Sequence, residues 1–466
     1  MKNIIFINEI INSNKYIDNE VKICGWIRTV RNFKSGISFL MVYDGSCFKS
    51  IQVIIKNNLL NYNKISKLTT GCSVMITGIV KRAQKSEQLY EIYAIYVKVL
   101  GLVDIPDEYP MSSKYHSLEH LRNFAHLRSR TNLIGAVSRI RNTIFQAINN
   151  FMDRENFIWV PTPLITTVDS EGLGQMFKVS TLDFKNLPKK LNGNIDYKKD
   201  FFGKEVFLTV SGQLTVESYA CAISKVYTLG PTFRAEHSNT SRHLAEFWML
   251  EPEVAFANLK DIMYLSEKMI KHIIKFVITN NIDDMEFLGK RINLNLINRL
   301  NNILKIKFIH INYTDVINIL KKFEKNFQNP VEWGKDLYLE HEKFLSDKYF
   351  NLPIIIKNYP KNIKAFYMRV NSDNKTVAAM DILMPDIGEI IGGSQREERL
   401  NYLDQRLNEM KIKKENYWWY RDLRRYGTIP HSGFGLGLER LLLYITGLQN
   451  IRDVIPFPRT NKDANF

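Results

Sequence analysis

Five runs rich in apolar, β-branched and aromatic residues, interrupted by polar ones, lie within the first hundred residues, at 21–29, 37–44, 48–55, 73–82 and 90–99. Runs of this length and composition predict β-strands. Between the third and fourth stretches, residues 57–68 carry leucines and an isoleucine near helical spacing. Five strands with a helix between the third and fourth predict an OB-fold β-barrel, whose open face often binds oligonucleotides.

The pattern changes to a helical period after residue 131. Apolar side chains recur every three or four residues from 134 to 151, which predicts an amphipathic helix over 132–156. The apolar stretch FIWVPTPLIT follows, and it contains Pro161 and Pro163. Because proline cannot donate a hydrogen bond within a sheet, we expect this strand at a sheet edge or an interface.

These patterns predict an α+β chain with two domains. We expect the barrel at 1–103, a hinge rich in proline, histidine and arginine at 104–131, and a second domain at 132–466. Residues 258–352 are expected to form a mostly helical insertion in the second domain. Residues 181–204 form a basic stretch that we expect to be a loop.

The net charge of +16 favours a polyanionic partner, with nucleic acid ahead of a membrane surface. Drift toward AT-rich codons would give the same lysine excess without a function. The four cysteines lack metal-ligand spacing, which argues against a structural zinc or a disulfide framework. No signal-like start or membrane-length apolar run is present, so we expect a cytoplasmic protein without membrane contact.

Candidate chemistry begins in residues 226–256, which predict two strands joined by the polar loop HSNTSRH. Arg234 and Glu236 are expected on the first strand, where a spacing of two puts them on one face. Such a pair suits a ligand charged at both ends, although a cross-strand ion pair on a solvated face would look the same.

A second group of charged residues lies near the C-terminus. Asp381 and Glu389 are expected at strand ends near a Gly-Gly turn, where two carboxylates could hold a divalent cation together with substrate phosphates. Arg396 follows the turn and would face the same cavity. Arg440 is expected near the start of a helix that follows the glycines of HSGFGLG.

Two further segments could contact a ligand. Residues 169–174, DSEGLG, form a polar loop suited to moving over a ligand. The stretch FLTVSGQLTVESYA predicts a strand, a turn and a helix, in which Ser211 and Gln213 could either cap the helix or hold a small polar ligand. In the barrel, Phe39 could stack on an unpaired base or belong to the core.

Three segments resemble the signature motifs of the class II aminoacyl-tRNA synthetases: FIWVPTP at 157–163, FRAEHSNTSRHLAEF at 233–247 and GFGLGLERL at 433–441. With the barrel ahead of them, they are similar in order and spacing to the asparaginyl-tRNA synthetases over essentially the whole chain. The resemblance implies ATP-dependent activation of L-asparagine to asparaginyl-adenylate, then transfer to the 3′ end of tRNA-Asn. Neither step needs a protein nucleophile.

The resemblance also implies roles at the ATP site. Arg234 would bridge the α-phosphate and the asparagine carboxylate, Glu236 would hold the adenine amino group, and Phe247 would stack on the ring. The residues implied for the β- and γ-phosphates are His243 and Arg440, and those for Mg²⁺ are Asp381 and Glu389. The aspartyl relatives have a serine where this chain has Gly392, so one metal contact is expected to be absent or supplied by water.

For the amino acid, the resemblance implies that Ser211, Gln213 and Glu171 receive the asparagine backbone and that Arg396 reaches its side-chain oxygen. The aspartyl relatives carry a lysine at the position of Val216, and Glu217 follows it here. Losing a cation and gaining an acceptor disfavours a bound carboxylate and favours an amide.

In the barrel, the resemblance implies that Phe39 stacks on the middle anticodon base and that Gln52 and Arg28 add hydrogen bonds, so that the GUU anticodon is recognised. It also implies a homodimer through residues 132–166. Three alternatives remain open: an aspartyl-tRNA synthetase, including the kind that charges both tRNAs, a small-molecule amide ligase without tRNA, and an RNA-binding paralogue without charging activity.

Overall fold

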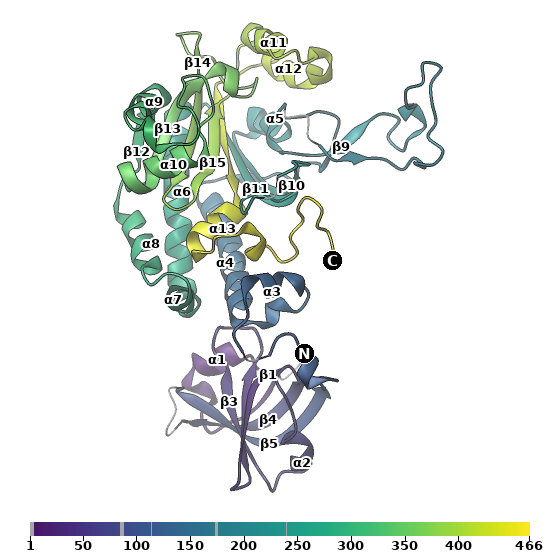
Figure 1. Ribbon diagram of the computed structural model, residues 1–466, viewed down its shortest axis with the longest axis vertical. Coiled ribbons are helices and arrows are strands. Elements are labelled where there is room, and N and C mark those ends of the chain that lie inside the picture. The colour runs from purple at the N-terminus through teal and green to yellow at the C-terminus, as the bar shows by residue number, and fades with distance from the viewer. Residues whose placement is uncertain (1–3, 84–87, 113, 173–175, 239) are drawn as a thin grey trace. The chain divides into compact units, whose positions relative to one another are not determined.

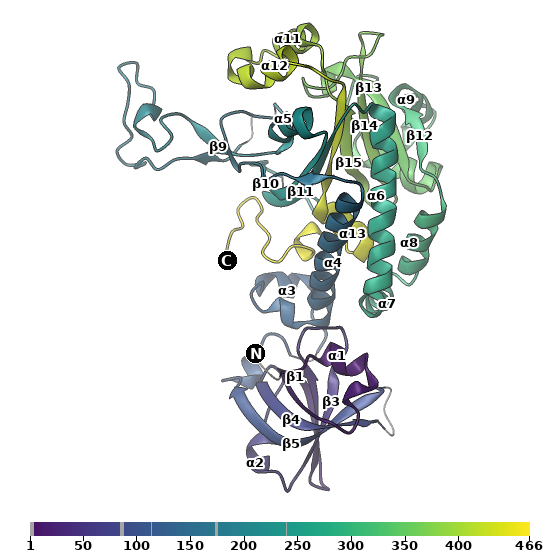
Figure 2. The same ribbon diagram turned by 180° about the vertical axis from the view of Figure 1, so that it is seen from behind.

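The computed structural model describes residues 4–83, 88–112, 114–172, 176–238 and 240–466 (Figures 1 and 2). It divides into two compact units, one of residues 1–140, 281–288 and 466, the other of residues 141–280 and 289–465. Within the described ranges, no helix is both long and apolar enough to cross a membrane.

The first unit contains a closed five-stranded barrel, which confirms the predicted OB-fold. Its strands pair in the order β1-β2-β3-β5-β4. Alternate positions along the strands are buried in the barrel, and Ile23, Leu40, Val53 and Ile76 are fully buried. The expected helix between the third and fourth strands is a single turn, α2 (Tyr62–Ile65). The strands are β1 (Glu20–Phe33), β2 (Ile37–Tyr43), β3 (Ile51–Lys56), β4 (Ser73–Arg82) and β5 (Tyr90–Gly101).

The second unit is built on an eight-stranded sheet in the order β12-β13-β14-β15-β16-β11-β10-β6. Neighbours pair antiparallel except at the two ends, where β12–β13 and β10–β6 are parallel. The strands are β6 (Ile158–Trp159), β10 (Lys225–Phe233), β11 (Glu246–Ala255), β12 (Ile309–Asn312), β13 (Ile354–Pro360), β14 (Thr376–Met384), β15 (Gly388–Gln395) and β16 (His431–Gly437). The proline-containing stretch supplies β6, which lies at the sheet edge as its prolines predict.

The principal helices are α4 (Asn132–Arg154), α5 (Gln213–Ile223), α6 (Leu259–Asn280), α7 (Ile282–Arg291), α8 (Leu296–Lys305), α9 (Tyr313–Lys321), α10 (Leu339–Lys343), α11 (Leu400–Glu409), α12 (Trp418–Arg425) and α13 (Leu438–Thr446). The stretch expected as a helical insertion, 258–352, holds α6 to α10, and it also supplies β12. Because β12 pairs with β13, this stretch is part of the sheet.

A small three-stranded sheet, in the order β7-β9-β8, stands beside α5. Its strands are β7 (Ile165–Thr166), β8 (Lys178–Val179) and β9 (Val206–Leu208). The basic stretch between β8 and β9 runs outward as a long arm (Figures 1 and 2). Asp200 anchors its base by accepting hydrogen bonds from Ser180 Oγ at 2.7 Å and from the Thr181 and Phe201 amides at 2.9 and 2.8 Å. These bonds, that of Ser180 first, lower the pKa of Asp200 to about 2.

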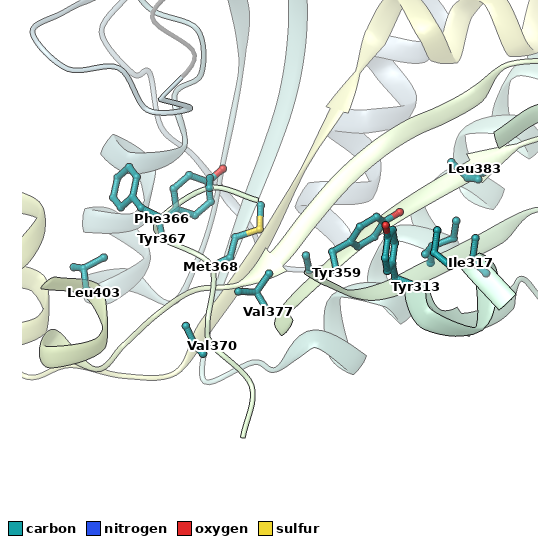
Figure 3. Close-up of a cluster of buried hydrophobic side chains, with 14 of the residues drawn as sticks. Tyr313, Ile317, Tyr359, Phe366, Tyr367, Met368, Val370, Val377, Leu383 and Leu403 are labelled. Atoms are coloured by element: carbon teal, nitrogen blue, oxygen red, sulfur yellow. The ribbon is translucent and has the colours of Figure 1, made fainter. Parts of the chain in front are cut away.

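A cluster of buried aromatic and aliphatic side chains supports one side of the sheet (Figure 3). Tyr313 and Tyr359 pack with their ring centres 5.1 Å apart, and Phe366 lies against Tyr417 with a separation of 5.1 Å. The cluster fixes residues 365–370, so that Tyr367, which follows Phe366, is held at the edge of the cavity described next.

Candidate active site

A cavity of about 330 Å³ opens in the second unit, between β11, β14, β15 and the start of α13. Its volume lies within the range of small-molecule sites, about 300–1,000 Å³. Segments that are far apart in the sequence meet on its walls. The expected site residues that line it are Glu171, Gln213, Arg234, Glu236, His243, Phe247, Asp381, Glu389, Arg396 and Arg440.

Arg234 and Glu236 lie directly after β10 rather than on it, so their expected place on the strand was wrong. The paired strand residues end at Phe233 and Glu246, although the Arg234 amide still donates to the Ala245 carbonyl at 2.9 Å. The chain turns after this bond, where the Ser238 amide donates to the Glu236 carbonyl at 2.9 Å. Both side chains still line the cavity. The Arg234 guanidinium carbon lies 5.3 Å from the centre of the Phe247 ring.

The Arg234 side chain is chemically available. Among the residues that the structure describes, no hydrogen-bonding partner meets its buried Nε, and no carboxylate pairs with its guanidinium. Leaving a buried guanidinium nitrogen unpaired costs free energy, so a site of this kind favours an anionic ligand that would satisfy it.

A histidine and an arginine of the polar loop after β10 also line the cavity. His243 Nε2 lies 3.7 Å from Glu236 Oε2, and burial lowers the pKa of the imidazole. Arg242, which sequence reasoning missed, also lines the cavity, and burial lowers its pKa as well. An arginine in a polar loop carries no periodic signal. Residue 239 of this loop lies outside the described residues.

The two expected metal carboxylates face each other across neighbouring strands. Asp381 lies inside β14, opposite Gly392 of β15, so its expected place at a strand end was wrong. Glu389 is the second residue of β15. A Cβ at position 392 would lie 3.3 Å from Glu389 Oε1 and 3.4 Å from Asp381 Oδ1. The absent side chain thus leaves space between the carboxylates.

Cations already surround this pair. Lys364 Nζ donates to Asp381 Oδ2 at 2.6 Å, and Arg440 Nη1 donates to Glu389 Oε2 at 3.2 Å. Burial raises the pKa of Asp381. Burial also opposes ionisation of Glu389, but the charges of Arg440 and Lys364 outweigh it and lower its pKa. Glu342 of α10 accepts the Glu389 amide at 3.2 Å and adds a third carboxylate nearby.

Hard divalent cations prefer carboxylate, phosphate and water oxygens. Asp381 and Glu389, with the open space at Gly392, fit that preference. The described residues contain no group of three or more histidine, cysteine or acidic side chains that could hold a metal alone. A cation here would therefore need oxygen ligands from a phosphate or from water.

Arg396, which directly follows β15, is nearly fully buried and lines the same cavity. Its Nε donates to both carboxylate oxygens of Glu253 at 3.2 Å, and its Nη1 donates to Ser394 Oγ at 2.7 Å. Burial raises the pKa of Glu253 to about 7. A Cβ at Gly433, in the glycine-rich strand β16, would lie 2.1 Å from Glu253 Oε1, so only glycine leaves room for this carboxylate.

Positions 216 and 217 lie apart from the cavity wall. Val216 packs in an apolar cluster with Val160 and Val226. Glu217 is fully buried behind Gln213, whose Nε2 donates to Glu217 Oε1 at 3.1 Å. Burial opposes its ionisation, but a hydrogen bond from His431 and the charge of Arg424 outweigh burial and lower the pKa of Glu217.

Ser211 also lies behind the wall. Its hydroxyl donates to Glu251, which accepts the Gly212 amide as well at 2.9 Å and itself lines the cavity. Glu171, on the wall, accepts a hydrogen bond from Tyr367 at 3.4 Å. Residues 173 and 174, part of the loop expected to move over a ligand, lie outside the described residues.

Several wall residues were missed from the sequence. Met249 and Glu251 follow the expected Phe247 at alternate positions of β11, and all three line the cavity. The period of two would have placed Met249 and Glu251 beside Phe247. Lys364 and Tyr367 precede β14 in an irregular segment, where no period predicts which side chains face inward.

In the barrel, two of the three expected anticodon residues lie on the outer face of neighbouring strands. Half-buried Phe39 pairs in register with Arg31 and contacts the Phe33 ring edge-to-face at 5.3 Å. Gln52 Nε2 donates to Glu91 Oε2 at 3.1 Å. The structure does not bring Arg28 to them: its guanidinium lies over the Tyr43 ring, 4.1 Å from the centre, at a β-bulge in β1.

Two family models match the chain. The model described as tRNA synthetases class II (D, K and N) matches residues 117–461, and the model of the OB-fold nucleic acid binding domain matches residues 21–100.

Relatives and solved structures agree with these models. The asparagine–tRNA ligase of Sodalis glossinidius (strain morsitans) is 61% identical over 450 residues, covering 96% of this chain and 97% of that protein. The ligase of Klebsiella pneumoniae is 58% identical over 464 residues, covering 99% and 100%. The structure of asparaginyl-tRNA synthetase from Pyrococcus horikoshii complexed with asparaginyl-adenylate is 32% identical, with a TM-score of 0.84 and 99% of both chains covered.

Proposed function

The chain belongs to the asparaginyl-tRNA synthetases of class II, and we propose from this membership and from its cavity that it activates L-asparagine with ATP and transfers it to tRNA-Asn. One observation carries the residue-level proposal. A single cavity collects ten of the residues expected at the ATP, metal and asparagine sites, although they come from segments spread between Glu171 and Arg440.

The ATP end of the cavity lies at the β10–β11 hairpin and the start of α13. Phe247 would stack on adenine and Glu236 would accept its amino group, since a flat apolar ring and a carboxylate match the two parts of that base. His243 and Arg440 would meet the β- and γ-phosphates. Arg440 follows Gly437 at the first turn of α13, where the helix dipole also favours an anion.

Arg234 is the residue that we propose to act on the reacting atoms. In the first step, a carboxylate oxygen of asparagine forms a bond to the α-phosphorus, and the bond from that phosphorus to the bridging oxygen of pyrophosphate breaks. Arg234 would donate to the α-phosphate and to the asparagine carboxylate, which aligns the attack and offsets the negative charge. Its unpaired Nε supports this role.

Asp381 and Glu389 would hold Mg²⁺, with phosphate oxygens and water completing its ligands. When bound there, the ion would supply positive charge to the phosphates. Lys364, which donates a hydrogen bond to Asp381, would add its own positive charge at this site.

At the asparagine end, Glu171 and Gln213 would receive the ammonium group. Ser211 would contribute indirectly, by holding the Glu251 carboxylate on the cavity wall. Arg396 would donate to the side-chain oxygen. Its bonds to Glu253 and Ser394 fix the guanidinium and leave one N–H of each terminal nitrogen for a ligand.

We propose that the barrel binds the anticodon, with Phe39 as a stacking platform and Gln52 as a hydrogen-bonding group. Glu91 and Arg31 lie beside them and would assist. Arg28 lies over the Tyr43 ring, so it would contribute to this face only indirectly.

A homodimer through residues 132–166 remains our proposal. The support is the exposed apolar edge strand β6, in which Ile158 and Trp159 are about half exposed (51% and 52%).

We also propose the cytoplasm as its compartment, because tRNA charging requires ATP and tRNA.

The decisive experiment is ATP–pyrophosphate exchange with purified protein, comparing asparagine with aspartate, followed by charging of tRNA-Asn transcript. We expect exchange with asparagine and charging of tRNA-Asn. Equal exchange with aspartate would replace this proposal with an aspartyl or dual-specificity enzyme. Exchange without charging would favour an amide ligase, and absence of both would favour the RNA-binding paralogue.

A further inference from the structure

Arg141 of α4 connects several of the segments that build the ATP end of the cavity. Its Nη2 lies 2.7 Å from Oε1 of Glu439, in an ion pair whose side chains are only 13% and 1% exposed. Its Nη1 donates to the Val454 carbonyl at 3.3 Å. Val454 belongs to the C-terminal segment in which Ile451 lines the cavity and donates its amide to the Ser241 carbonyl of the polar loop at 2.9 Å.

Glu439 is the residue through which Arg141 reaches the cavity, because its side chain lines the wall. Its Oε2 accepts the backbone amide of Trp248 at 3.0 Å. The backbone pairing of β11 with β16 begins one residue later, so this carboxylate extends the hydrogen bonding of β11 back to Trp248. The bond therefore holds the backbone directly after Phe247, the proposed adenine platform.

A second contact from α4 fixes the same place on β11. Phe145 lies four residues after Arg141, on the same face of the helix. Its ring meets the Trp248 ring edge-to-face, with the centres 5.3 Å apart. The backbone and the side chain of Trp248 are thus both held, directly or through Glu439, by this face of α4.

The charge of Arg141 also matters to an anionic ligand. Glu439 places a carboxylate in the wall directly before Arg440, which we propose to meet the phosphates. Like charges repel strongly in a partly enclosed site, so an uncompensated carboxylate here would oppose the binding of ATP. Arg141 compensates it through the ion pair.

We propose that Arg141 is a positioning residue for ATP. Through Glu439 it holds the strand that carries the adenine platform, and it cancels a carboxylate that would otherwise repel the phosphates. This inference rests on the proposed function, since it needs ATP to bind in this cavity. It gives α4 a role besides its proposed contact in the homodimer.

The test is equilibrium binding of ATP, measured by titration calorimetry, together with pyrophosphate exchange by the full-length protein at varied ATP and asparagine. The variants are Arg141→Met, Arg141→Lys and the double variant Arg141→Met with Glu439→Gln. Arg139→Met is the matched control. Arg139 lies on the same helix and pairs with Asp284 at 2.7 Å, with exposed fractions of 17% and 5%, but neither is among the described residues that line the cavity. Melting temperatures are measured for every variant, and binding and kinetics are measured well below the lowest of them.

We expect Arg141→Met to raise the Kd and the KM for ATP by about 10- to 100-fold, with the KM for asparagine within about twofold of the parent. Arg141→Lys keeps the charge but not the fork, so its rise should be about two- to fivefold. The double variant should return to within about threefold of the parent, because the amide oxygen of Gln still accepts the Trp248 amide and no charge is left unpaired. Arg139→Met should lower the melting temperature without changing ATP binding.

Unchanged ATP binding in folded Arg141→Met, or in Arg141→Lys if Arg141→Met does not fold, would overturn the inference. An equal weakening in Arg139→Met, or a double variant that binds ATP no better than Arg141→Met, would also overturn it, because the contact would then be merely structural. A parent that binds ATP but gives no exchange with asparagine would instead refute the proposed function, and the ATP-binding comparison would still decide the role of Arg141.

Discussion

Replacing Arg234 with alanine should separate catalysis from folding. Among the described residues, its buried Nε has no hydrogen-bonding partner, no carboxylate pairs with its guanidinium, and the guanidinium carbon lies 5.3 Å from the centre of the Phe247 ring. We therefore expect the free energy of unfolding to change by no more than about 1 kcal/mol, as for substitutions that leave no cavity or unpaired group.

The cost to activity should be much larger. A guanidinium that spans the α-phosphate and the asparagine carboxylate makes about two charge-assisted hydrogen bonds, each worth about 1.5–3 kcal/mol. Losing roughly 3–6 kcal/mol in the transition state lowers kcat/KM by about 10²- to 10⁴-fold. Arg234→Lys keeps the charge but not the planar fork, so its loss should be intermediate.

The assay is ATP–pyrophosphate exchange with asparagine, together with thermal unfolding and tRNA binding. We expect exchange to fall by at least about a hundredfold in Arg234→Ala, while the melting temperature and the tRNA affinity stay close to those of the parent. Exchange within about threefold of the parent would refute the role, because an unpaired cation that touches no substrate contributes nothing to the barrier. A large drop in melting temperature would show instead that Arg234 supports the fold.

Other changes test the remaining parts of the molecule. Phe39→Ala should lower kcat/KM for tRNA charging by about 5- to 150-fold, the worth of one base stack, and leave exchange unchanged; an equal fall in exchange would show that Phe39 is structural. Gly433→Ala places a Cβ 2.1 Å from Glu253 Oε1 and 2.4 Å from the Pro252 carbonyl, so we expect a loss of about 1–3 kcal/mol of stability and a higher KM for asparagine. Parent-like melting and kinetics would contradict that crowding. Chelation of divalent cations should stop exchange, and Asp381→Asn should raise the Mg²⁺ concentration for half-maximal rate, whereas an unchanged Mg²⁺ titration would exclude Asp381 as a ligand.

Patterns of residues close together in the sequence predicted many of the strands and helices. The barrel strands follow from runs of apolar, β-branched and aromatic residues, which favour extended backbone. The glycine-rich approach to Arg440 and the edge position of β6 follow from the backbone limits of glycine and proline. These features depend on residues close together in the chain.

The polar contacts of the site could not be predicted in this way. Arg424 and Glu217 are separated by more than 200 residues, and their pairing depends on how α12 packs against α5. Val216 and Glu217 are both fully buried, and only the point at which α5 begins decides which of them enters the apolar cluster. Likewise, the sequence could not show that β10 ends one residue before Arg234.

The stretch between β11 and β13 has a consequence for protein engineering. Its mostly helical character suggests that it could be deleted. However, its strand β12 pairs with β13, and its Glu342 accepts a hydrogen bond from the backbone amide of Glu389. Cutting it out to make a minimal enzyme would leave a bare parallel edge on the sheet and release the strand that carries a proposed metal ligand. A shortened protein should therefore keep this stretch. The arm between β8 and β9, which extends away from the rest of the unit, is the better segment to delete.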